Sequence, residues 1–260
     1  MVCDIGPLQK ERNMNRFFVN KENILGGEII INDREDIHHI TKVLRLKKGE
    51  LCDISDSETW EYRTEIICFS EKEIRAKILD KQKFSSEPKL KITLFQGIPK
   101  QGKMESIIQK SVELGVYSVV PVFTVRTVVS RNENFAKKID RWQKVSGEAV
   151  KQCRRGIIPK VEKEMSFSDM INIFNDKNFD MVLFPYENEE THSIKTALRN
   201  LKEKPQALAV IIGPEGGFSD EEAQALTMAG ACSVSLGKTT LRTETAAAAA
   251  IAMTMYELEL

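Results

Sequence analysis

The strongest constraint on the fold is a change near residue 85 in the order of the expected strands and helices. Before it, short β-prone runs such as "EIIIN" (28–32) and "YRTEIICF" (62–69) alternate with charged turns, which predicts a small barrel. After it, strand-like runs beginning with "KITLFQG" (91–97) alternate with helical segments. This alternation predicts an α/β domain with a parallel sheet. The segment "DKQKFSSEPK" (80–89) is expected to be the linker between the two parts.

Composition places the chain among ordinary globular proteins. It has 260 residues, of which 42% are hydrophobic and 29% charged, and its formal net charge is zero. No apolar run approaches the length of a membrane span, and the N-terminus has no signal-peptide pattern, so a cytoplasmic protein is expected. A neutral chain has no overall attraction for nucleic acid, so any RNA-binding surface must be local.

Cysteine and histidine give no sign of a metal site. The five cysteines are far apart, without a CxxC pair, and the three histidines lack metal-ligand spacing. We therefore expect reduced thiols and no bound metal.

Two helices have clear signals at their ends. The segment 103–115, "KMESIIQKSVELG", carries an apolar stripe and has Gly115 placed to end the helix. In segment 33–49, Asp33 is a candidate N-cap. The apolar residues of that segment follow helical spacing: Ile37, Ile40, Val43 and Leu44.

Three turns are expected to meet at the carboxyl edge of the parallel sheet, where such folds bind ligands: 184–187, 213–217 and 236–242. In the middle turn, "GPEGG", the glycines allow either tight packing or close approach of a ligand. Ser219 and Glu222 then form a capping box at the start of a helix. The spacing matches no phosphate-binding loop, and Glu215 would repel a dianion. A ligand with a neutral adenosine or with a cationic group fits better. S-adenosylmethionine has an adenosine part and a positively charged sulfonium.

Polar residues precede the alanine-rich last helix. Thr243 could cap that helix and Glu244 could complement its dipole. Arg242, at the mouth of the expected pocket, could bind phosphate or a developing oxyanion. The alanine run 246–250 suits either a core helix or a helix that packs against a second subunit.

Residues 137–163 hold nine Lys or Arg residues against three acids, a local excess of six. At 100° per residue, Trp142 and Ala149 share an apolar face, and the basic residues lie nearly opposite. This pattern fits a solvated helix face or a phosphate-contacting stripe. A second basic group lies in the barrel part, at Arg16, Lys42, Arg45, Lys47 and Lys48.

Several ordered motifs resemble the 16S ribosomal RNA uridine-N3 methyltransferases of the SPOUT class. They are "HHITKVLRLKKGE" (38–50), "QGIPKQGKMESIIQKSVELGV" (96–116), "RWQKVSGEAVKQCRR" (141–155), "IIGPEGGFSDEE" (211–222) and "LGKTTLRTETAAAAA" (236–250). The resemblance implies a PUA-like RNA-binding β-barrel over 14–84 and a methyltransferase domain with a C-terminal trefoil knot over 85–260. Residues 1–13 precede the family's usual start and are interpreted as an extension. The family is homodimeric and uses S-adenosylmethionine.

The resemblance also implies the site residues. Those matching the family's cofactor-binding loops are Phe184, Ile212, Gly213, Pro214, Glu215, Gly216, Gly217, Leu236, Gly237, Leu241 and Arg242. For catalysis we expect Arg242 to stabilise negative charge on the uracil, with Glu215 or Glu244 as candidate bases. The chain departs from the family pattern at Lys238–Thr240 and at Cys153.

The expected partner is 16S ribosomal RNA, within the small ribosomal subunit. The candidate RNA contacts are Arg16, His39, Lys42, Arg45, Lys103, Arg141, Lys144, Lys151, Arg154 and Arg155. Two other functions remain open at this point: a different SPOUT reaction such as ribose 2'-O-methylation, and a non-catalytic RNA-binding protein.

Overall fold

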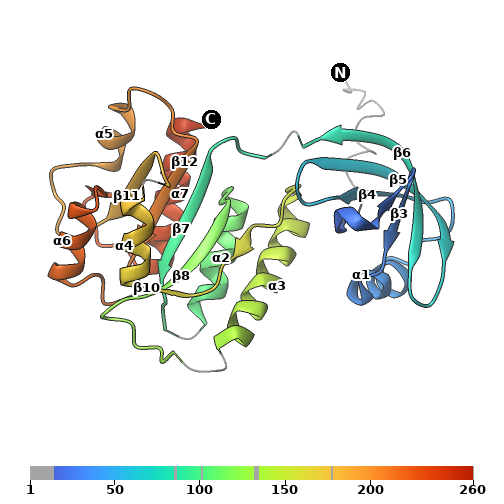
Figure 1. Ribbon diagram of the computed structural model, residues 1–260, viewed down its shortest axis with the longest axis horizontal. Coiled ribbons are helices and arrows are strands. Elements are labelled where there is room, and N and C mark those ends of the chain that lie inside the picture. The colour runs from blue at the N-terminus through green and yellow to red at the C-terminus, as the bar shows by residue number, and fades with distance from the viewer. Residues whose placement is uncertain (1–14, 85–86, 101, 132–134, 177, 260) are drawn as a thin grey trace, which may run out of the picture. The chain divides into compact units, whose positions relative to one another are not determined.

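The computed structural model describes residues 15–84, 87–100, 102–131, 135–176 and 178–259 (Figure 1). The expected extension, residues 1–13, lies outside this range. The chain divides into two compact units. The first comprises the residues up to Glu87 together with Arg154–Ile158, and the second comprises Pro88–Cys153 and Pro159–Leu260. No helix of the described residues is long and apolar enough to cross a membrane.

The first unit is built on a six-stranded, mostly antiparallel sheet. Its strands, in their order across the sheet, are β1 (Arg16–Phe18), β4 (Leu51–Ser55), β5 (Trp60–Phe69), β6 (Ile74–Lys83), β3 (Glu28–Ile31) and β2 (Ile24–Leu25). Alternate residues point to one face and form its core, with Phe17, Ile29 and Ile54 buried. The short runs of the sequence therefore form the predicted β unit.

The predicted helix of this unit differs from expectation in its second half. Asp33 is the N-cap of α1 (Arg34–His38), but the chain then continues as a π-helix, η4 (His39–Val43). The wider turn, closed by a 2.9 Å bond from Leu44 N to His39 O, rotates Val43 out of the apolar stripe. Its side chain is 58% exposed, although Val43 follows the same helical spacing as the buried Ile40.

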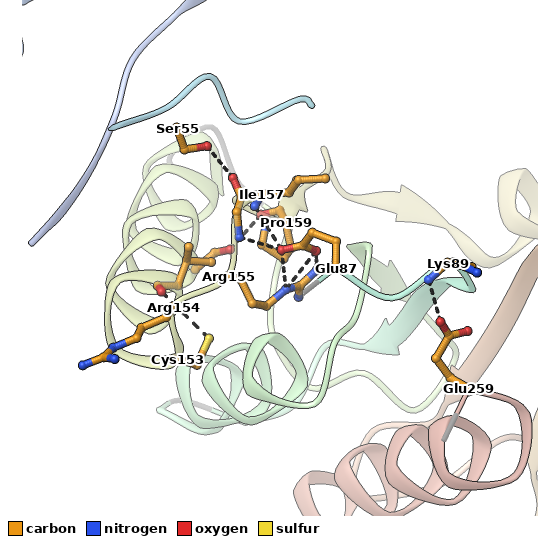
Figure 2. A network of polar contacts seen from close by, with 12 residues as sticks. Ser55, Glu87, Lys89, Cys153, Arg154, Arg155, Ile157, Pro159 and Glu259 are labelled. Atoms are coloured by element: carbon orange, nitrogen blue, oxygen red, sulfur yellow. Dashed lines mark hydrogen bonds and ion pairs between the residues drawn. The ribbon is translucent and has the colours of Figure 1, made fainter. Parts of the chain in front are cut away.

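Of the segment expected as a linker (80–89), residues 80–83 belong to the end of β6, and the boundary between the two units falls after Glu87. The first unit also includes a segment from far along the chain. Arg155 forms an ion pair with Glu87, and the Ser55 hydroxyl donates a 2.6 Å bond to the carbonyl of Gly156 (Figure 2). Nothing in the sequence pattern predicted this return.

The second unit contains a seven-stranded sheet whose described pairings are all parallel, as predicted. Its order is β10 (Met165–Ser166), β8 (Ser118–Phe123), β7 (Lys91–Gly97), β12 (Ala207–Ile212), β11 (Met181–Pro185) and β13 (Cys232–Val234), with β9 (Lys160–Val161) also pairing with β8.

Helices cover both faces of this sheet (Figure 1). They are α2 (Lys103–Glu113), α3 (Phe135–Cys153), α4 (Phe167–Asn175), α5 (Ile194–Arg199), α6 (Asp220–Met228) and α7 (Thr243–Leu258). Ala209 and Ile211 of β12 pack with residues of α4 and α6 in one apolar cluster. The strand's alternate residues face the opposite side, where α7 contacts β12 and β7. Gly115, with φ +96°, follows the end of α2 as predicted.

Candidate functional site

A cavity of about 990 Å³ lies at the carboxyl end of β11, β12 and β13. Its lining comes mainly from the three turns that the sequence placed together. The lining residues that the sequence also predicted are Lys103, Ile212, Gly213, Pro214, Glu215, Gly217, Leu236, Gly237, Leu241 and Arg242. The expected convergence of loops is thus present in the structure.

The middle turn, residues 213–217, is closely packed against β7. A Cβ added to Gly97 would lie 2.6 Å from both Cδ and N of Pro214, so the strand and the turn approach backbone to backbone. Gly217 has φ +67° and its N–H donates a 2.9 Å bond to the carbonyl of Pro214, closing a tight turn. The glycines therefore serve tight packing as well as access to the cavity.

Gln96 and Thr243 connect the middle turn to the start of α7. The Gln96 amide donates to the Thr243 hydroxyl at 2.9 Å, and that hydroxyl donates to the carbonyl of Gly213 at 2.7 Å. Arg242, not Thr243, occupies the N-cap position of α7, and no side chain caps that end. The Thr243 hydroxyl thus links two loops of the cavity instead of capping the helix.

The far end of the turn is held by the predicted capping box. Ser219 is the N-cap of α6 and Glu222 is its reciprocal partner. The other carboxylate oxygen of Glu222 accepts a 2.9 Å bond from Val125 N, in the loop after β8. In the same loop, Arg126 donates a 2.7 Å bond from Nη1 to the carbonyl of Gly216. Sequence reasoning did not identify this second loop as a support of the turn.

Lys103, at the start of α2, lies between two carboxylates. Its ammonium is 3.2 Å from Oε1 of Glu215 and 3.2 Å from Oε2 of Glu244. The backbone N–H of Lys100 donates to both oxygens of Glu215 at 3.1 Å. The sequence predicts Lys103 as an RNA contact, but the structure places its charge in the cavity lining, where it joins α2, the glycine turn and α7.

These contacts lower the pKa of both carboxyls. For Glu215, burial raises the pKa, but hydrogen bonds from its own N–H, from Lys100 N and from the Lys103 ammonium together hold the pKa below its usual value. For Glu244, a hydrogen bond from its own N–H, followed by the Lys103 ammonium, lowers the pKa. The Glu215 side chain raises the pKa of Lys103 through a hydrogen bond. All three groups are charged at neutral pH.

Arg242 presents its side chain to the cavity and is exposed. In the described part of the chain no carboxylate lies within ion-pair distance of its guanidinium, whereas Lys103 is paired twice. A cation without a fixed partner at a pocket mouth can bind a phosphate or a developing negative charge.

The loop after β11 adds an acidic side to the cavity, which begins in the expected turn 184–187 and extends beyond it. Glu187, Glu189 and Glu190 all line it. Glu189 accepts hydrogen bonds from the Thr191 hydroxyl, from His192 N and from Thr191 N, which lower its pKa to about 2. These carboxylates suit a ligand that carries positive charge.

Two predicted cofactor residues do not line the cavity. Phe184 is 1% exposed and packs in the sheet's apolar core against Phe218. Its successors Pro185 and Tyr186 reach the cavity instead, because the alternation of strand residues turns Phe184 inward. Gly216 is the second, and its carbonyl accepts a hydrogen bond from Arg126. Within the described residues, no group of three or more His, Cys, Asp or Glu side chains could hold a metal ion.

In the first unit, the predicted RNA contacts separate into two sets. His39, Lys42 and Arg45 are exposed on α1–η4 and the turn after it. Arg16 is engaged inside the unit, where it forms an ion pair with Glu61 and donates to the carbonyls of Arg154 and Arg155. Arg155 is 6% exposed. The charges of Arg16 and Arg155 are therefore not presented at the surface.

On the second unit, α3 carries the rest of the predicted basic stripe. Arg141, Lys144 and Lys151 are exposed, and Arg141 lies 3.2 Å from Glu105 of α2. Trp142 and Ala149 are buried on the opposite side, as predicted. The helix ends at Cys153, so Arg154 and Arg155 do not belong to the helical stripe.

Comparison with known proteins identifies both parts of the chain. A family model of the RNA methyltransferase domain matches residues 86–255, and one of the RNA methyltransferase PUA domain matches residues 31–79. The chain is similar to the ribosomal RNA small subunit methyltransferase E of Bacillus subtilis (strain 168), with 30% identity over 95% of this chain and 98% of the relative. The protein of that name from Buchnera aphidicola subsp. Acyrthosiphon pisum is 33% identical over 93% of each chain.

A solved structure supports the same relationship. The ribosomal RNA small subunit methyltransferase E from Neisseria gonorrhoeae, bound to S-adenosyl methionine, is 30% identical. It superposes with a TM-score of 0.81 over 94% of this chain and 98% of the other.

Proposed function

This chain belongs to the family of ribosomal RNA small subunit methyltransferase E, and on that premise we propose that it methylates N3 of a uridine in 16S ribosomal RNA. It is a methyltransferase whose cofactor is S-adenosylmethionine. The observation that carries the proposal is the cavity at the sheet edge, which three turns of the second unit enclose.

The residues of the cavity fit this cofactor. When bound, S-adenosylmethionine supplies an electrophilic methyl group on a positively charged sulfur. The acidic side formed by Glu187, Glu189 and Glu190 suits that charge, and the turns 213–217 and 236–242 offer backbone N–H and C=O groups to an adenosine. The Gln96, Thr243 and Gly213 hydrogen bonds join three chain segments beside the cavity.

The proposed role of Arg242 follows from its free charge. Uridine N3 loses a proton when it becomes the nucleophile, and negative charge then spreads to the flanking carbonyl oxygens. A guanidinium at the cavity mouth stabilises that charge and holds the base in place. Glu215 and Glu244 remain the candidate bases, but their lowered pKa values make them weak proton acceptors and favour a role in positioning Lys103.

The test is an Arg242→Ala variant, with Arg242→Lys as the charge-retaining control. We expect methyl transfer to 16S ribosomal RNA to fall by about 100-fold or more, with affinity for S-adenosylmethionine nearly unchanged by calorimetry. Full activity in Arg242→Ala would remove the proposed role.

The position of the new methyl group is then mapped by mass spectrometry of digested RNA. A methyl group on a ribose 2'-oxygen would contradict N3 methylation. No binding of S-adenosylmethionine to the unaltered protein would favour a non-catalytic RNA-binding protein.

We also propose a homodimer that acts on the small ribosomal subunit in the cytoplasm. Support comes from α7, where Met253 and Tyr256 are 38% and 72% exposed on an otherwise alanine-rich helix. Small side chains beside exposed apolar ones suit close packing against a second helix. Light scattering should give the mass of a dimer for the unaltered protein, and Tyr256→Glu should shift it toward the monomer.

A further inference from the structure

An aromatic and basic cluster lies on β5 and β6 of the first unit, and none of its residues is among the predicted RNA contacts. Trp60 begins β5 and pairs across the sheet with Lys83, while Tyr62 pairs with Lys81. The ammonium of Lys81 lies 4.0 Å from the centre of the Trp60 ring and 5.7 Å from that of Tyr62. The ammonium of Lys83 lies 5.7 Å from the Trp60 ring.

The indole is fixed in position by its surroundings. Trp60 is partly buried and packs against the barrel core. Its backbone N–H donates a 2.8 Å bond to Asp56, which also accepts from the N–H groups of Glu58 and Thr59. The turn before β5 therefore fixes the backbone of Trp60, the core supports its ring, and the ammonium groups of Lys81 and Lys83 lie over that ring.

The lysines are the uncompensated charges of this region. Glu58 is paired with Lys21, Glu61 with Arg16, and Asp56 accepts three backbone N–H groups. Asp80 alternates with Lys81 along β6 and so points to the other face of the sheet. Among the described residues, no carboxylate pairs with Lys81 or Lys83.

We propose that Trp60, Lys81 and Lys83 form a binding site for an unpaired RNA base and its neighbouring phosphates. A rigid aromatic ring stacks on any base, and lysines beside it contact the backbone. When a base stacks on Trp60, the ammonium groups move from the ring to the phosphates. This inference rests on the proposed RNA substrate and adds residues of β5 and β6 to the expected RNA contacts of the first unit.

The chain has two tryptophans, and the other, Trp142, is 5% exposed within the second unit. The variant Trp142→Phe therefore makes Trp60 the sole indole reporter. We expect a ten-nucleotide single-stranded oligouridylate to quench its emission saturably, and a duplex of equal length to quench it much less. Unchanged emission, or equal quenching by the duplex, would overturn base stacking at Trp60.

Affinity of the same oligonucleotide, labelled with fluorescein, is measured by anisotropy. Trp60→Leu should weaken binding about 5- to 100-fold. Lys81→Ala with Lys83→Ala should reduce the slope of log K against log salt by about 0.7 for each lost phosphate contact. The charge-matched control is Lys195→Ala with Lys202→Ala, two exposed lysines of the second unit. Equal losses in both double variants would contradict the site.

Circular dichroism establishes that each variant is folded, and calorimetry with S-adenosylmethionine is run on each. If methyl transfer and cofactor binding persist while Trp60 shows no quenching, the base-binding site is refuted and the proposed function stands. If cofactor binding and methyl transfer are both absent from the unaltered protein, the proposed function itself fails.

Discussion

The Lys103 side chain connects two loops of the cavity lining through its ion pairs. Its ammonium is the shared counter-charge of Glu215 and Glu244, which belong to different loops. Without it, two carboxylates of like charge face each other beside the cofactor turn, and the turn loses a tether to α2.

We therefore predict that Lys103→Met lowers affinity for S-adenosylmethionine several-fold and reduces methyl transfer, while Lys103→Arg retains most of both. Calorimetry and a methyl-transfer assay measure the two effects. Lys100→Met is the control, because Lys100 contacts Glu215 through its backbone N–H and keeps that bond in the variant. Equal effects of Lys100→Met and Lys103→Met would argue against the role of the ammonium.

Glu189 gives a pH-dependent prediction. Its carboxylate accepts three hydrogen bonds from the loop after β11, and its pKa is about 2 in the folded protein. A carboxyl whose pKa is lowered by folding stabilises the fold above its unfolded pKa of about 4.3. That contribution is lost as the pH falls through the folded pKa.

Glu189→Gln should therefore lower the melting temperature at pH 7, and the difference from the unaltered protein should shrink as the pH falls from about 4.3 toward 2. Thermal melts across that range measure the effect. A difference that stays constant with pH would mean that the loss comes from packing and not from charge.

At the scale of elements, the contact between β7 and the turn 213–217 leaves no space for a side chain at residue 97. A methyl group at residue 97 would meet both Cδ and N of Pro214 at 2.6 Å, and the backbone on either side is fixed by the sheet. Gly97→Ala should thus destabilise the protein by about 1–3 kcal/mol and weaken cofactor binding.

The control is Gly147→Ala in α3, where an added Cβ would meet nothing within 4 Å. Alanine there should stabilise the protein by up to about 1 kcal/mol, because it favours the helix. Chemical denaturation followed by circular dichroism compares the two variants. Finding the same sign for both would contradict the packing argument.

Elements with a local physical signal were predictable. Gly115 ends α2 and Ser219 with Glu222 caps α6, because each acts on backbone groups a few residues away. The π-helix over His39–Val43 could not be predicted, since a π-helix and an α-helix share the same apolar residues and differ in one hydrogen-bond step. The meeting of the three cavity turns could be predicted from the alternation of strands and helices. The ion pairs of Lys103 could not, because they join residues more than a hundred positions apart and no sequence periodicity reports them.

At the scale of the whole molecule, the Glu87 and Arg155 pair completes the first unit with a distant segment. Their side chains are 12% and 8% exposed, and Glu87 also accepts from the N–H groups of Gly156 and Ile157. Glu87→Ala removes the carboxylate that contacts the Arg155 guanidinium and two backbone N–H groups, so we predict a loss of about 3 kcal/mol of unfolding free energy.

Urea denaturation of the full chain measures that loss. In a double-mutant cycle, Glu87→Ala combined with Arg155→Ala should cost less than the sum of the two single changes. Strict additivity would show that the two side chains do not interact energetically.

The return of residues 154–158 to the first unit has a consequence for biosynthesis. A growing polypeptide leaves the ribosome from its N-terminus, and domains usually fold in that order. Here the acceptor for the Ser55 hydroxyl, the carbonyl of Gly156, is made a hundred and one residues later. The barrel can therefore form this bond only after β7, α2, β8 and α3 have been synthesised, while β11, β12, β13 and α7 of the second unit are still to be made.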